Sequence, residues 1–97
     1  MFLVHAHFAT LGPVELPSGA GELIRASLYP ADQVEHVSAH SVPPGRFVLG
    51  FFLLTGSLHE AEGRAEAICR RLLDEERLPP AVLREVGAPL ITPLLPP

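Results

Sequence analysis

The chain has 97 residues, of which 47% are hydrophobic and 19% are charged, a composition that fits one small domain with a single core. Eleven acidic residues outnumber seven arginines, and the net charge of −4 argues against a nucleic-acid partner, because phosphate binding needs clustered cations. The single cysteine, Cys69, excludes an intrachain disulfide and a thiolate zinc site.

The first part of the chain predicts a strand followed by a short helix. Met1–Thr10 is rich in β-branched and aromatic residues and leads into a Gly-Pro pair, which is typical of a strand. Side chains alternate across a strand, so the expected core face is Phe2, Val4, Ala6 and Phe8, and the expected opposite face is Leu3, His5, His7 and Ala9. A connection rich in glycine and proline follows, in which Ser18 is the expected N-cap. Helical spacing then predicts a helix over about Ala20–Leu28, although Glu22–Tyr29 also alternates as a strand would.

The middle of the chain predicts an antiparallel hairpin. Gln33–Val42 alternates, and the face expected to carry its histidines is Val34, His36, Ser38, His40 and Val42. A Pro-Pro-Gly turn leads directly into Arg46–Thr55, and so short a loop pairs the two strands antiparallel. The second of these strands is apolar on both faces, which is typical of a central strand covered on both sides.

The clearest predicted element is a helix that begins after Ser57. Ser57 and Glu60 have the spacing of a capping box, and an apolar stripe follows at helical spacing: Leu58, Ala61, Ala65, Ile68 and Leu72. We expect this helix to end near Glu75 or the next residue. Beyond it, Ala81–Val86 is expected to add one or two helical turns. Pro89–Leu95 is expected to form a last strand at a sheet edge, because its prolines cannot donate to a ladder.

This order of elements, β-α-β-β-α-β, predicts an α+β fold, a ferredoxin-like sandwich in which two helices cover one face of a four-stranded antiparallel sheet. The first and third strands would be central and the second and fourth would lie at the edges. The third strand also carries apolar side chains on the uncovered face, which predicts a second copy packed sheet against sheet in a two-fold homodimer. We expect residues 1–97 to form this single domain.

The layout, together with the closing residues Ala88-Pro89-Leu90-Ile91-Thr92-Pro93-Leu94, resembles the dimeric α+β-barrel superfamily. That superfamily includes small isomerases, cyclases, cofactor-free monooxygenases and members with no known activity. Residues 50–73 are also similar in style to small uncharacterised actinobacterial proteins. The resemblance implies a homodimer with a ligand cleft, but no catalytic motif of a member family matches. It therefore assigns no functional residue, since a fold does not fix a function.

Four histidines are the candidates for chemistry: His5, His7, His36 and His40. If His5 and His7 point away from the helices, they lie in the cleft, where an imidazole could accept or donate a proton. Their Cα atoms would be about 6.6 Å apart, so the two could also share a metal ion. Otherwise we expect no metal and no cofactor. The alternative, which is more common for such residues, is half-buried histidines at a dimer interface, satisfied by backbone groups or water.

Three further residues are predicted to contact a ligand: Tyr29, Arg46 and Phe52, with Arg46 as the anchor for a carboxylate. Other polar features have simpler interpretations. Ser57 is expected to be a plain helix cap and Cys69 an inert buried thiol. Asp74–Glu76 is expected to be a solvated turn at a helix end.

These observations favour a non-catalytic homodimeric module that binds a small apolar ligand or a partner protein, as an accessory factor in bacterial metabolism. The alternative is a small cofactor-free isomerase, cyclase or monooxygenase that uses the cleft histidines as acid and base.

The sequence also predicts no membrane association. The longest apolar run, Phe47–Leu54, is far shorter than the about 20 residues that a membrane-spanning helix needs. The first residues carry no cationic segment, and two histidines interrupt their apolar stretch, so no signal peptide is predicted. The expected location is the cytoplasm.

Overall fold

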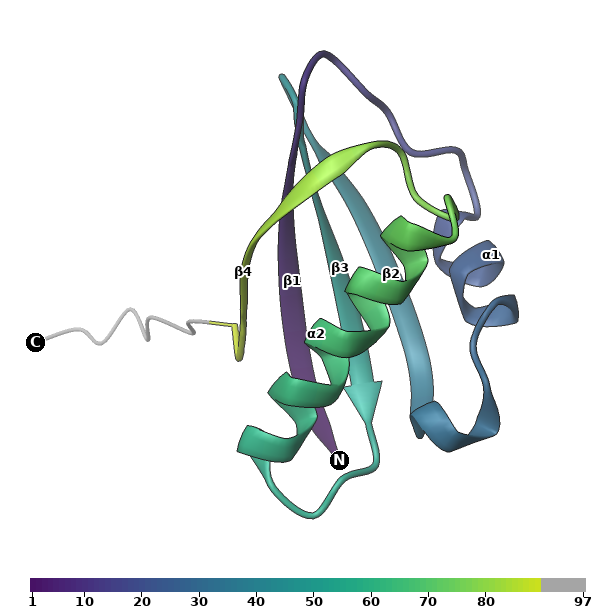
Figure 1. The fold of residues 1–97 in the computed structure, drawn as a ribbon, viewed down its shortest axis with the longest axis vertical. Helices are drawn as coiled ribbons and strands as arrows, with labels where there is room; N and C mark the ends of the chain where they lie inside the picture. The colour runs from purple at the N-terminus through teal and green to yellow at the C-terminus, as the bar shows by residue number, and fades with distance from the viewer. Residues whose placement is uncertain (90–97) are drawn as a thin grey trace, which may run out of the picture.

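The computed structural model describes residues 1–89 of the chain. It has the α+β architecture, with a four-stranded antiparallel sheet and two helices packed against one face (Figure 1). The elements in chain order are β1 (Phe2–Thr10), α1 (Ala20–Ala26), the 3-10 turn η1 (Pro30–Asp32), β2 (Val34–Val42), β3 (Arg46–Leu53), α2 (Leu58–Asp74) and β4 (Ala81–Gly87). The strand order is β2-β3-β1-β4, so β1 and β3 are central and β2 and β4 lie at the edges. The places of the first three strands are as predicted, whereas β4 is a segment for which the sequence predicted helical turns.

The elements up to the end of α2 are those predicted, with ends that shift by a few residues. α1 follows Gly19, which has a φ of 80° and occupies the N-cap position in place of the expected Ser18. α2 begins as predicted, because the Ser57 hydroxyl accepts a hydrogen bond from the Glu60 N–H at 3.1 Å. The Glu60 carboxylate in turn accepts one from the Gly56 N–H at 3.2 Å. Together these bonds fix the first turn of the helix.

The chain after α2 differs from the prediction. Ala81–Gly87 is a strand that pairs with β1, where the sequence predicted further helical turns. This strand does not show the two-residue alternation of a regular strand. A β-bulge at Arg84 places Leu83 and Val86 on the same side although they are three residues apart. Such spacing imitates a helix. Apart from Pro89, the predicted strand Pro89–Leu95 lies outside the described residues.

A second irregularity, at Glu35, corrects the face assigned to the start of β2. The register with β3 shifts between Val34 and His36. Val34 is therefore buried on the core side together with Val37, whereas the prediction grouped it with the histidines. From His36 onward the alternation follows the prediction.

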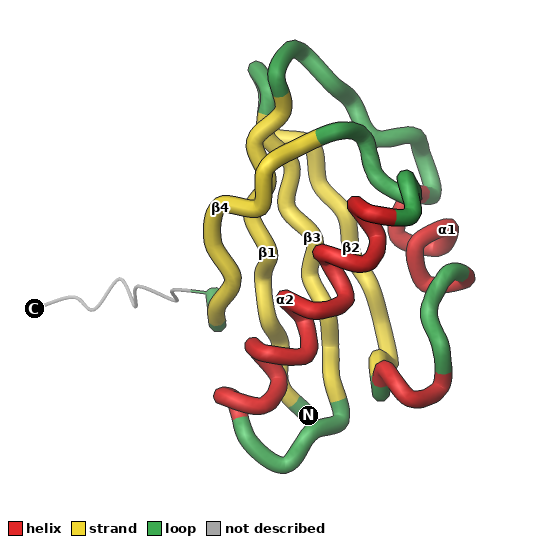
Figure 2. Tube along the Cα trace, viewed as in Figure 1, coloured by secondary structure: helices red, strands yellow, loops and turns green. Residues whose placement is uncertain are grey.

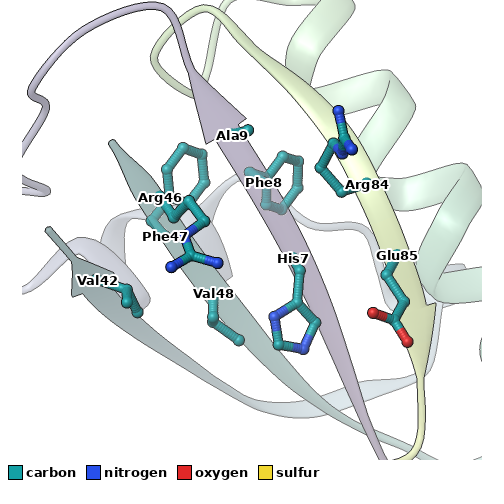
Figure 3. Close-up of a pocket in the computed structure, with 9 residues that line it drawn as sticks. All are labelled: His7, Phe8, Ala9, Val42, Arg46, Phe47, Val48, Arg84 and Glu85. Atoms are coloured by element: carbon teal, nitrogen blue, oxygen red, sulfur yellow. The ribbon is translucent and has the colours of Figure 1, made fainter. Parts of the chain in front are cut away.

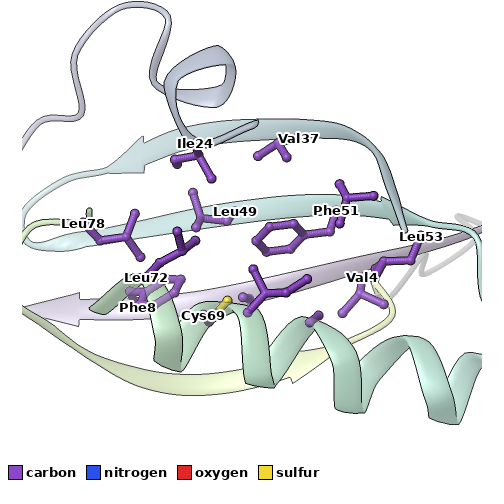
Figure 4. Close-up of a cluster of buried hydrophobic side chains, with 14 of the residues drawn as sticks. Val4, Phe8, Ile24, Val37, Leu49, Phe51, Leu53, Cys69, Leu72 and Leu78 are labelled. Atoms are coloured by element: carbon purple, nitrogen blue, oxygen red, sulfur yellow. The ribbon is translucent and has the colours of Figure 1, made fainter. Parts of the chain in front are cut away.

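The core lies between the sheet and the two helices (Figure 4). The aromatic rings of Phe8 and Phe47 stack in it, with their centroids 4.6 Å apart. The buried side chains of the central strands and of the two helices form one cluster, which includes Val4, Phe8, Ile24, Phe47, Leu49, Phe51, Leu53, Ala61, Ala65, Ile68 and Leu72. Because both helices pack on this side, the described residues leave the other face of the sheet uncovered (Figure 2).

A partly buried ion pair ties η1 to α2. The Asp32 carboxylate accepts two hydrogen bonds from the Arg71 guanidinium, at 3.0 and 2.7 Å, and a third from the Tyr29 N–H at 2.8 Å. The guanidinium also lies over the Tyr29 ring, 4.7 Å from its centroid. These contacts fix the connection between α1 and β2 against the helix layer.

Within residues 1–89, neither helix combines the length and the apolar character that crossing a membrane would require.

Candidate functional site

The uncovered face of the sheet, here called the open face, carries all four predicted histidines. Directly paired residues of neighbouring strands lie on the same side of a sheet, so the register assigns each position to a face. Three rows across the sheet hold the histidines: His40–Val48–His7–Glu85, Ser38–Gly50–His5–Gly87 and His36–Phe52–Leu3. A fourth row, Val42–Arg46–Ala9–Val82, borders them.

The centre of the open face is built around Gly50. A Cβ atom at this position would lie 2.5 Å from the Ser38 hydroxyl oxygen and 3.4 Å from Cδ2 of His5. Glycine therefore allows both side chains to lie over the backbone of β3, and Gly50 itself is buried beneath them.

The surroundings of His5 change the pKa of its imidazole. The rings of His5 and His7 are 6.3 Å apart between centroids. Burial lowers the pKa of His5 below 6.5, and repulsion from protonated His7 and His40 lowers it further. The imidazole of His5 is consequently neutral at neutral pH.

The structure brings three of the four histidines into this central group and separates the fourth. His40 lies across β3 from His7, with Val48 between them. His36 lies in another row, exposed and beside Phe52, with ring centroids 6.0 Å apart. Among residues 1–89 no three histidine, cysteine or carboxylate side chains are arranged to hold a metal ion.

A pocket of about 560 Å³ opens on this face beside the histidines (Figure 3). We call it the Arg46–Arg84 pocket; its lining is His7, Phe8, Ala9, Val42, Arg46, Phe47, Val48, Arg84 and Glu85. Figure 3 shows Arg46 on β3 and Arg84 on β4, with β1 and His7 between these strands. The pocket thus combines aliphatic side chains with two guanidinium groups, one imidazole and one carboxylate.

Of the three predicted ligand contacts, two lie on the open face and one does not. Arg46 lines the pocket, and Phe52 lies in a row nearer the other end of the face. Tyr29 lies at η1, where one side of its ring faces the Arg71 guanidinium, and the structure does not bring it to the pocket.

Arg84 and Glu85 are pocket residues that the sequence analysis missed, because it assigned them to a helical turn. Val82 and Val86 flank these two positions, and their β-branched side chains favour a strand. That signal is weak over so short a segment.

The remaining sequence candidates have structural roles. Cys69 is fully buried in α2, and burial raises the pKa of its thiol to about 12, which disfavours the reactive thiolate. Ser57 caps α2 as described above. Asp74, Glu75 and Glu76 are exposed at the end of α2, as expected for a solvated turn.

Comparison of the chain with protein-family models, with curated proteins and with solved structures found no match. The case for a function therefore depends on the open face and its pocket.

Proposed function

We propose that the domain is a ferredoxin-like sandwich of the dimeric α+β-barrel kind, which forms a homodimer through its open face and binds a small apolar ligand there. The observation that carries this proposal is the set of apolar side chains left partly or largely exposed across that face: Leu3, Val42, Val48, Phe52 and Val82. An exposed apolar patch of this kind typically marks an interaction surface.

The size of the open face suits a second copy of the chain. Four strands about 4.8 Å apart and seven to nine residues long, at about 3.3 Å per residue, give a flat footprint of roughly 500 Å². Side-chain relief enlarges this area toward the ~800 Å² per partner of a standard interface. A two-fold axis through the face would bring like surfaces together, so each apolar row would gain an apolar partner.

Dimerisation would also complete the ligand site. In one protomer the Arg46–Arg84 pocket is bordered by exposed side chains, among them Val42, Arg84 and Glu85. A second sheet laid over it would enclose a ligand, and ligand sites bury most of the ligand surface. In this proposal the protein is an accessory binding factor rather than a catalyst.

A cofactor-free isomerase, cyclase or monooxygenase is the second proposal, and one observation favours it. The lowered pKa of His5 leaves a neutral imidazole that can accept a proton on an apolar surface. A neutral imidazole is also easier to bury in an interface, so the same observation suits the binding module. His7 and Glu85 line a pocket together with His5 and could supply a second acid or base. The exposed apolar side chains of the open face are explained by binding alone, so we favour binding.

Sedimentation equilibrium tests the dimer directly. At micromolar concentration we expect a particle of twice the 10.4 kDa chain mass. Val82→Glu places a charge on the open face at a side chain that is 57% exposed in the protomer, so it should leave the fold intact and yield the monomer. Circular dichroism checks that the variant is folded.

Leu23→Glu is the matched control, because Leu23 is 62% exposed but lies on α1, away from the open face. We expect this variant to remain dimeric. A wild-type chain that sediments as a monomer, or a dimer that Leu23→Glu disrupts and Val82→Glu does not, would contradict the proposal.

A further inference from the structure

We infer that the Arg46–Arg84 pocket selects an apolar ligand that ends in a single carboxylate, held by the two arginines. This inference rests on the proposed function, because it names the ligand class of the same site. The evidence for the carboxylate is separate, since that part of the inference depends on charges rather than on the exposed apolar rows.

The two arginines are available for a ligand. The ion pairs formed within residues 1–89 use other arginines, namely Arg64, Arg70 and Arg71. Arg46 and Arg84 are exposed, and within that part of the chain neither has a carboxylate at ion-pairing distance. Guanidinium groups bind carboxylates through paired N–H donors, which makes them the preferred anchors for such ligands.

Arg46 and Arg84 line the same pocket, one on each side of β1. Arg46 pairs with Ala9, whereas Arg84 lies between the residues that pair with Phe8 and His7, so their backbones are two strand spacings apart and offset along the strands, about 11 Å. Two arginine side chains that turn toward each other can reach one group across this span. Arg84 is the extra residue between Leu83 and Glu85, and the bulge that it forms brings its side chain to the pocket.

The charge balance of the pocket favours a monoanion. Glu85 offsets one of the two arginines, so the guanidinium groups and the carboxylate of the pocket together leave one positive charge. One carboxylate would neutralise it, whereas a phosphate dianion would leave an excess negative charge in a protein whose net charge is already −4. The other lining groups, which include Ala9, Val42 and Val48, are aliphatic, so the rest of the ligand should be apolar.

Isothermal titration with two soluble compounds of the same apolar body tests the inference. We expect 4-phenylbutyrate to bind the dimer at least tenfold more tightly than 4-phenylbutan-1-ol. Arg46→Gln and Arg84→Gln should each reduce this preference to threefold or less. Arg77→Gln, a change at an exposed arginine beyond the end of α2, should retain the preference in full.

The outcomes separate the inference from the proposed function. Equal binding of the acid and the alcohol to a dimer would overturn the carboxylate anchor and leave the apolar-ligand module intact. Binding of neither compound would count against both. Displacement of 4-phenylbutyrate by an equal concentration of inorganic phosphate would overturn the role of the apolar lining. A loss of dimer affinity in the two arginine variants with an unchanged acid preference would assign the arginines to the interface alone.

Discussion

Asp32 shows how one side chain can fix a connection that has little apolar packing of its own. It is 7% exposed, yet three hydrogen bonds satisfy its carboxylate. The Arg71 hydrogen bonds are the largest cause that lowers the pKa of Asp32, and they outweigh the effect of burial, which raises it. The same pair raises the pKa of Arg71. Both groups are therefore charged over the whole physiological range.

Removing this charge should destabilise the domain. We expect Asp32→Asn to lower the free energy of unfolding by about 2–3 kcal/mol, because it leaves the Arg71 guanidinium without its partner. Urea unfolding measures the change. Asp74→Asn, at an exposed carboxylate on the same helix as Arg71, should change it by no more than about 0.5 kcal/mol.

The pH dependence gives a second test of the same pair. Because the folded-state pKa of Asp32 lies below its ordinary value of 3.8, the stabilisation is complete above that value. It is lost as the pH falls through the folded-state pKa. The wild type should therefore lose more stability than Asp32→Asn on acidification below about pH 4. Equal losses in the two proteins would show that the pair contributes nothing measurable.

At the scale of elements, the contact of α1 with the sheet depends on a close approach at Gly21. A Cβ atom there would lie 2.7 Å from the Val37 carbonyl oxygen, which belongs to the backbone of β2 and cannot move aside cheaply. A helix with glycine at this position can lie directly against an edge strand. This contact brings Ile24 into the core.

Gly21→Ala should destabilise the domain by about 1–3 kcal/mol, because the methyl group must push α1 away from β2. Gly63→Ala in α2 is the matched control, since nothing lies within 4 Å of a Cβ atom there. Alanine favours a helix over glycine, so this control should raise the stability by roughly 0.5–1 kcal/mol. Thermal unfolding of both variants distinguishes the two effects, and a gain in stability in both would refute the close approach.

The elements also show which parts of the fold the sequence could predict. α2 has a capping box at its start and an apolar stripe at helical spacing, and β3 is apolar after Arg46. Local patterns were therefore enough to predict both elements. The two edge strands each contain a bulge, at Glu35 and at Arg84, and a bulge breaks the two-residue period on which strand prediction depends. β4 was mistaken for a helical turn and Val34 was assigned to the wrong face for this one reason.

The candidate site followed the same pattern. His5 and His7 lie on a central strand, and alternation correctly placed both on the face away from the core. Arg46 was predicted as a ligand contact from its charge rather than from alternation. Arg84 and Glu85 joined the site only through the bulge in β4, which depends on pairing with β1 rather than on local sequence. Tyr29 lies in a connection whose position is set by the Asp32–Arg71 pair, a contact between residues 39 positions apart. Such contacts have no local signal.

At the scale of the whole molecule, the proposed dimer should depend on pH through the central histidines. His5 is surrounded by His7 on its own strand, His40 on β2 and the Ser38 hydroxyl beside Gly50, and Glu85 lies opposite His7 on β4. Burial already lowers the pKa of His5 in the protomer, and a second sheet would bury it further. The dimer should therefore bind fewer protons than two separate protomers, so its stability should fall as the pH drops below 6.5.

We expect the dimer dissociation constant to rise between pH 8 and pH 5, by up to about a hundredfold for each unit by which dimerisation lowers the pKa of His5, because each dimer contains two copies of this side chain. Sedimentation equilibrium at several pH values measures it. His5→Gln should flatten the profile, because glutamine does not titrate, whereas His59→Gln on the exposed surface of α2 should leave it unchanged. A wild-type dissociation constant that stays constant from pH 8 to pH 5 would show that these imidazoles lie outside the interface. The open face would then need another partner to cover its centre.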